Sequence, residues 1–120
     1  MIEVLPQSKG HTLGVRLTGK VSDEDYEKVF LPALENLIKE YGKIRCLYFM
    51  DEGFQGWELG AMWDDAKFGV KHKNDFAKIA VIGGPKWAEW ATKIASHLVS
   101  SEIKTYTTDQ LDDAWRWVKA

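Results

Sequence analysis

The chain has 120 residues, a length that fits one domain with its own hydrophobic core. Hydrophobic residues make up 45% of the sequence and charged residues 28%, a globular balance that excludes intrinsic disorder. The net charge of −2 excludes the strongly basic character of a nucleic-acid-binding domain.

The sequence also indicates where the protein resides. It has no run of about 18 apolar residues for a membrane-spanning helix, and Met1 leads directly into Ile-Glu-Val-Leu without an export signal. We therefore expect a single cytoplasmic domain over residues 1–120. Cys46 lies in an apolar run, so we expect a small buried side chain and neither a disulfide nor a Cys-pair metal site.

The first half of the chain predicts an antiparallel hairpin followed by a helix and a strand. Short strands are predicted at residues 2–5 and 12–18, and a loop rich in turn residues joins them. Ser22 is a good N-cap for a helix that ends at Gly42, and Pro32 predicts a kink or break near Val29. Residues 44–50 are apolar on both alternations, which is typical of a central strand covered on both faces.

The second half predicts alternating helices and strands. A helix begins near Trp57 and continues to about residue 70, a strand covers 77–82, and Pro85 starts a helix that runs to about Val99. A strand at 103–107 precedes a last helix, which Thr108 or Asp109 caps. Its apolar stripe is formed by Leu111, Ala114, Trp115 and Val118, and we expect the indole N–H of Trp115 to find a hydrogen-bond partner.

This order, β-β-α-β-α-β-α-β-α, predicts the α/β class, with about five strands in a mixed, mostly parallel sheet and four helices. The antiparallel part is the N-terminal hairpin, and the crossovers should be right-handed. Ligands bind such sheets at the carboxyl ends of the strands. Residues 50–57, 83–87 and 107–109 should therefore lie near each other.

The segment 50–70 carries more large apolar side chains than one helix face can bury. Residues 59, 62, 63, 66 and 70 form one stripe, whereas Trp57, Ala61 and Phe68 fall on the opposite side. We interpret the surplus as the wall of an apolar ligand pocket, as a lid, as a cover for the edge of the sheet, or as a dimer contact. The candidate ligand-binding residues are Phe54, Trp57, Met62, Trp63, Phe68, Trp87 and Trp90.

Charge along the chain is uneven. Residues 67–86 hold five lysines and one acid, whereas residues 23–40 are mainly acidic. Solvated faces explain both stretches, but the alternative is peripheral contact with the anionic inner membrane surface. That hypothesis assigns membrane contact to Trp57, Lys67, Lys71 and Lys73.

The sequence shows no catalytic, metal-binding or cofactor-binding signature. Asp51 and Glu52 follow the central strand but should point apart, so we predict no catalytic residues. The histidines are dispersed, and none has metal-ligand spacing. The turn at 83–86 could present amides to an anion, although the need for glycine in a tight turn explains it more simply. We expect neither a metal nor a cofactor.

Three segments together resemble a known family. Glu40-Tyr41-Gly42-Lys43-Ile44-Arg45, the aromatic segment with Trp57, and Ala80-Val81-Ile82-Gly83 before Trp87 are similar to the SpoIIAA-like proteins. Their fold is related to STAS domains and to lipid-carrying CRAL-TRIO domains. The resemblance implies a small cytoplasmic STAS-like domain that binds an apolar ligand or associates with membranes, and it implies no established chemistry.

One departure from the STAS pattern limits what the resemblance carries over. Anti-sigma antagonists of that superfamily have a phosphorylated serine or threonine after the central strand, whereas residues 51–65 contain neither. A phospho-switch is therefore not expected there. The sequence favours a non-catalytic module that binds an apolar or lipid-like ligand. The alternative is a protein-interaction or regulatory module that forms a homodimer or docks a partner.

Overall fold

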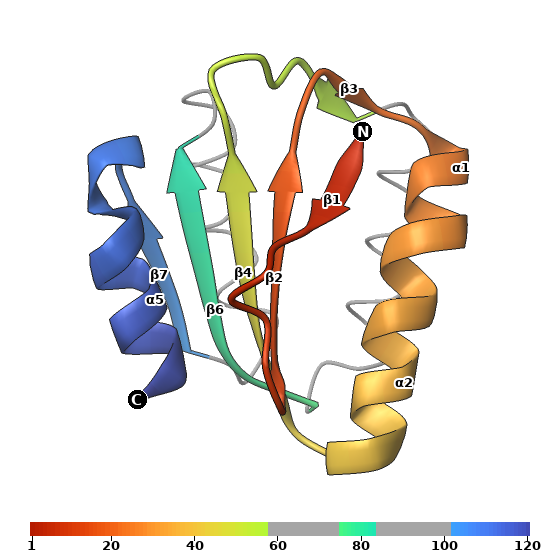
Figure 1. Cartoon of the computed structure of the whole chain (residues 1–120), viewed down its shortest axis with the longest axis vertical. Coiled ribbons are helices and arrows are strands. Elements are labelled where there is room, and N and C mark those ends of the chain that lie inside the picture. Colours follow the sequence, from red (N-terminus) through yellow and green to blue (C-terminus); the bar gives the residue numbers. More distant parts are fainter. Residues whose placement is uncertain (58–74, 84–101) are drawn as a thin grey trace.

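The computed structural model describes residues 1–57, 75–83 and 102–120 and is organised around a five-stranded sheet (Figure 1). The strand order is β1-β2-β4-β6-β7. These strands are β1 (Ile2–Val4), β2 (Thr12–Leu17), β4 (Ile44–Met50), β6 (Phe76–Gly83) and β7 (Glu102–Tyr106). Only the β1–β2 pair is antiparallel, and the other three pairs are parallel. The mixed sheet with an N-terminal antiparallel pair and a central strand at 44–50 is thus confirmed.

Two helical segments flank this sheet, at its right and left in Figure 1. The first comprises α1 (Asp23–Asp25), a π-helical turn η1 (Tyr26–Phe30) and α2 (Leu31–Tyr41). The second comprises a 3-10 turn η2 (Thr108–Gln110) and α5 (Leu111–Lys119). Apart from Trp57, the two other expected helices, at 57–70 and 85–99, lie outside the described residues.

The first helix begins and ends where the sequence predicts. The Ser22 hydroxyl accepts from the Asp25 amide at 3.1 Å, and the Asp25 carboxylate accepts from the Ser22 amide at 3.3 Å, which forms a capping box. Partial burial raises the pKa of Asp25, but hydrogen bonds from Ser22 and the nearby Met1 ammonium lower it below the ordinary value. Gly42, with φ of 80°, ends the helix.

Pro32 leaves the helix continuous, so of the predicted kink or break the break is wrong. Pro32 has no amide proton to give to the carbonyl four residues earlier. The chain responds by widening one turn: the Leu31 amide donates to the Tyr26 carbonyl, five residues back. Tyr26 and Phe30 are both buried by this π turn, and their rings contact each other edge to face. The irregularity thus lies where Pro32 predicts it, but in another form.

The two faces of the sheet have separate cores. Alternate residues of β2 and β4, among them Val15, Leu17 and Cys46, pack with Phe30 and Leu34 on the side of α2. Cys46 is fully buried, as expected. The side chains between them in sequence lie on the opposite face, where Leu47 and Ala80 meet residues of α5. This alternation explains why strand β4 is apolar on both alternations.

Strand register arranges the α5 side of the sheet in three rows, because paired residues point to the same face. The first row is Thr12, Arg45, Lys78 and Glu102; the second is Gly14, Leu47, Ala80 and Lys104; the third is Arg16, Phe49, Ile82 and Tyr106. In the first row, Arg45 and Lys78 donate to the carbonyls of Val118 and Trp117, at 2.9 and 3.1 Å. Two cations from the sheet thus satisfy the C-terminal end of α5.

The C-terminal helix differs from its prediction at both its cap and its tryptophan. Thr107, rather than Thr108 or Asp109, is the N-cap, and it forms a capping box with Gln110 before α5 begins at Leu111. The predicted apolar stripe is confirmed by the burial of Ala114, Trp115 and Val118. We expected a hydrogen-bond partner for the indole N–H of Trp115, and this expectation is wrong. Within the described part of the chain the N–H has no partner.

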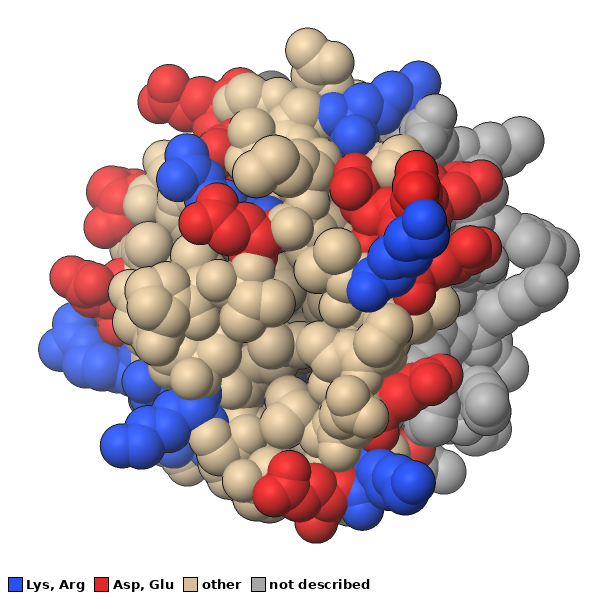
Figure 2. All heavy atoms as spheres, turned by 45° about the vertical axis from the view of Figure 1, so that its right-hand side comes forward, with Lys and Arg blue, Asp and Glu red and all other residues tan. Residues whose placement is uncertain are grey.

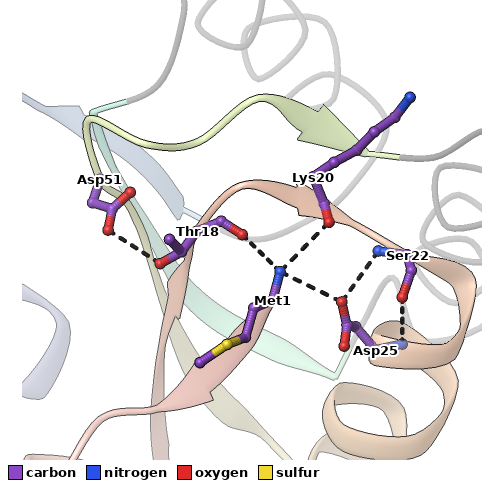
Figure 3. A network of polar contacts seen from close by, with 6 residues as sticks. All are labelled: Met1, Thr18, Lys20, Ser22, Asp25 and Asp51. Carbon is purple, nitrogen blue, oxygen red and sulfur yellow. Dashed lines mark hydrogen bonds and ion pairs between the residues drawn. The ribbon is translucent and has the colours of Figure 1, made fainter.

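Two features of the carboxyl end of the sheet were not predicted. Strands β3 (Lys20–Val21) and β5 (Gly56–Trp57) form a separate parallel pair, so a strand occupies the position where the sequence suggested a helix start. The Met1 ammonium lies beside this region, where it donates to the Thr18 carbonyl at 2.6 Å and approaches the Asp25 carboxylate at 3.4 Å (Figure 3). These contacts join β1 to the end of β2 and the start of α1.

The surface on the α1–α2 side is not uniformly acidic. Figure 2 shows carboxylates there with basic side chains among them, next to a broad area without charged side chains. Lys28, for example, pairs with Glu24 one turn earlier on the helix. No described helix is both long and apolar enough to cross a membrane.

Candidate functional site

The ends of the parallel strands meet at one edge of the sheet, as the sequence predicts. Leu17 pairs with Met50, and Met50 pairs with Gly83. A side chain at Gly83 would collide with the Met50 carbonyl oxygen and would lie 3.0 Å from the Thr108 methyl group. Its φ of 74° also requires glycine. The last residues of β4 and β6 and Thr108, which follows β7, are therefore close neighbours.

Asp51 forms a polar cluster at this edge. Its Oδ2 atom accepts from Arg16 Nε at 2.9 Å and lies 2.7 Å from Arg16 Nη2. The Thr18 hydroxyl donates to the same oxygen at 3.1 Å (Figure 3), and the Gly53 amide donates to Oδ1 at 2.9 Å. The Asp51 side chain is 12% exposed, so these hydrogen bonds replace most of its hydration.

The cluster keeps Asp51 ionised. Partial burial by itself raises the pKa of Asp51, but the hydrogen bonds from Arg16, Thr18 and Gly53, together with the Arg16 charge, lower it below the ordinary value. An acid with a lowered pKa is a poor proton donor near neutral pH. Glu52, which follows it, is exposed. The geometry therefore gives no support to an acid–base pair at these two residues.

A groove of about 510 Å³ lies beside this cluster on the α5 side of the sheet. Its apolar lining comes from Leu5, which follows β1, Phe49 in β4 and Leu111 in α5. Its polar lining comes from Gln7, Arg16, Asp51, Glu52, Gly53 and Thr108. Arg16 and Phe49 belong to the third row, so strand register places a cation and an aromatic ring side by side.

Sequence reasoning missed this groove. Arg16 interrupts an otherwise apolar strand, Thr-Leu-Gly-Val-Arg-Leu, and that interruption was the one available sign of a buried partner. Its partner Asp51 was named, but only beside Glu52 as a candidate catalytic acid that the sequence did not favour. The two are far apart in sequence, and parallel pairing of β2 with β4 brings them together.

The predicted ligand-binding residues are for the most part outside the described residues. Phe54 is half-buried and packs against the α2-side core, and the groove lining does not include it. Trp57 lies in β5. Outside the described ranges are Met62, Trp63, Lys67, Phe68, Lys71, Lys73, Trp87 and Trp90. The predicted aromatic pocket and membrane contact therefore stay predictions.

No group of three or more His, Cys, Asp or Glu side chains within residues 1–57, 75–83 and 102–120 could hold a metal ion. His11 lies in the loop after β1, where it is exposed. Its ring approaches Tyr41 edge to face, with 6.3 Å between ring centroids.

The mixed sheet, the flanking helical segments and the convergent carboxyl edge define a small STAS-like α/β domain. The SpoIIAA-like family model matches residues 12–119, and the chain belongs to the SpoIIAA-like family. A crystal structure of an uncharacterised protein with a SpoIIAA-like fold from Shewanella loihica PV-4 is 32% identical to this chain. The alignment covers 98% of this chain and 92% of that one, with a TM-score of 0.71. No curated protein matches the chain. The fold suggests a regulatory or interaction module.

Proposed function

We propose that this protein is a non-catalytic module that binds a small ligand with an apolar body in the carboxyl-edge groove. The groove itself carries the proposal. Its volume of about 510 Å³ falls in the range of small-molecule sites, roughly 300–1,000 Å³. It also combines apolar walls with a few polar groups, which is the usual composition of such sites.

The position of the groove supports the same function. Ligands of open α/β sheets bind outside the carboxyl ends of the strands, and this groove lies there. The one acid in the groove that is largely shielded from solvent, Asp51, accepts hydrogen bonds from Arg16, Thr18 and Gly53. Because these partners hold the carboxylate in place, its role is structural, which favours binding over catalysis.

The proposal has a first extension, in which a lid or a further pocket wall is formed by the aromatic segment 57–70, Trp87 and Trp90. Peripheral contact with an anionic membrane through Trp57, Lys67, Lys71 and Lys73 is a second extension. Each lysine would contribute about 1 kcal/mol near such a surface, so attachment would be reversible. Co-sedimentation with anionic vesicles, compared with zwitterionic ones, tests it, and loss of binding in a Lys67→Ala/Lys71→Ala/Lys73→Ala variant is the expected result.

Native mass spectrometry of gently purified protein, followed by organic extraction, tests the binding function. We expect a retained apolar mass in the wild type. Leu5→Asn should remove it, because Leu5 lines the groove. Val4→Asn is the matched control, since the neighbouring Val4 is 44% exposed and is not part of the lining. A wild-type chain without added mass, which also shows no amide shifts on titration with 2-octanone, would contradict the proposal.

A protein-interaction module is the second candidate. The described residues include four exposed large apolar side chains, Met1, Val4, Val29 and Tyr41, at 39–61% exposure. Figure 2 shows a broad area without charged side chains on the face that it presents. Sedimentation velocity over a wide concentration range tests a homodimer. A concentration-dependent dimer that Val29→Lys abolishes would favour this function, and a monomer at all concentrations would oppose the homodimer.

A further inference from the structure

We propose that the carboxyl-edge groove selects ligands whose polar head is uncharged and offers a hydrogen-bond-accepting oxygen, and that it discriminates against anionic heads. The ligand class is thus a neutral amphiphile such as a ketone, an ester or a quinone. This inference rests on the proposed binding function. It is carried by the arrangement of Arg16, Asp51 and Glu52 around the apolar lining.

Arg16 is the hydrogen-bond donor for the ligand head. A guanidinium group has five N–H donors, and Asp51 engages Arg16 through Nε and Nη2. The remaining donors can therefore serve a ligand, because the side chain is 47% exposed and lines the groove. Asp51 also fixes the orientation of the guanidinium group, so little conformational entropy is lost when an acceptor binds.

The charges around the groove oppose an anionic head. Asp51 already compensates the positive charge of Arg16 at 2.7 Å. Glu52 also lines the groove and forms no ion pair within the described part of the chain. Arg16, Asp51 and Glu52 together therefore carry a net negative charge, which repels a carboxylate or phosphate head.

A cationic head is also disfavoured. An ammonium group has no acceptor for the Arg16 donors, and it would approach the Arg16 charge. The net negative charge attracts an ammonium group, but an ion pair with the exposed Glu52 contributes little and leaves the Arg16 donors without an acceptor. A neutral carbonyl oxygen uses the oriented donors without an opposing charge.

Three eight-carbon probes test the selectivity: 2-octanone, octanoate and octylamine, each titrated below its micelle concentration at pH 7 and followed by amide chemical shifts. We expect 2-octanone to bind, with the largest shifts at groove residues, and octanoate to bind about fivefold more weakly or worse. Glu52→Gln should tighten octanoate binding several-fold relative to 2-octanone binding. Because Glu52 is exposed, this variant should fold normally.

Arg16→Lys is the second variant, since it keeps the positive charge and removes the planar guanidinium group with its several N–H donors. It should weaken 2-octanone binding several-fold. Octanoate or octylamine binding as tightly as 2-octanone would overturn the inference while leaving the binding function intact. So would a Glu52→Gln variant with unchanged octanoate affinity. If none of the three probes binds, this inference fails, and the binding function fails with it when the purified chain also carries no apolar mass.

Discussion

Gly14→Ala tests whether the α5 core is as closely packed as the structure shows. A Cβ atom at Gly14 would lie 2.6 Å from Cζ2 of Trp115 and closer still to Cη2, well inside van der Waals contact. Trp115 is 7% exposed and lies among Leu47, Ala80 and Val118, so its ring has little room to shift. Overpacking of this kind costs about 1–3 kcal/mol of unfolding free energy.

Urea unfolding measures that cost, and Trp115→Phe supplies the control. Phenylalanine lacks the Cη2 and Cζ2 atoms, so the two closest contacts of the added methyl group are removed. In that background Gly14→Ala should be neutral, or stabilising by about 0.4–1 kcal/mol, because alanine restricts the unfolded chain. The effect of the methyl group should therefore change between the two backgrounds. An equal loss of stability in both would refute the packing argument.

Two further predictions concern stability. Asp51→Asn should lower the unfolding free energy by about 1–3 kcal/mol at pH 7, because charge-assisted hydrogen bonds to Arg16 and Thr18 are weakened. The folded-state pKa of Asp51 is lowered, so its contribution is complete above the unfolded value of about 4 and is lost as pH falls through the folded value. Urea midpoints of wild type and variant should thus converge below pH 4, and a constant difference down to pH 2 would contradict this account. Ser22→Ala should cost about 0.5–2 kcal/mol through loss of the capping box, with Ser22→Thr as the conservative control. Equal midpoints for Ser22→Ala and wild type in urea would show that the cap contributes nothing.

Local patterns predicted much of the fold because their physical causes are local. Ser22 caps and Gly42 ends the first helix through groups within a few residues in sequence. The central position of β4 follows from its apolar residues on both faces. The width of the helical turn before Pro32 was not predictable, because a missing amide proton is compatible with a kink, a break or a π turn.

The candidate site was less accessible to sequence reasoning because it depends on strand register. Arg16 lies in β2 and Asp51 follows β4, and no local pattern fixes the register that brings them together. Gly14 and Trp115 are likewise related through the packing of α5 on β2. The small β3–β5 pair has two residues in each strand, which is too short for an alternating pattern. The predicted aromatic pocket residues, apart from Phe54 and the backbone of Trp57, lie outside the described residues.

The parallel pairing of the sheet also has a consequence for how fast the protein folds. Strand β4 pairs with β2 and β6 through contacts such as Thr12 with Arg45 and Arg45 with Lys78, each distant in sequence. Each parallel pair can form only after a long loop of chain has closed, so the entropy loss comes before the stabilising contacts. We therefore expect folding on about the millisecond-to-second timescale, slower than a helical bundle of equal length.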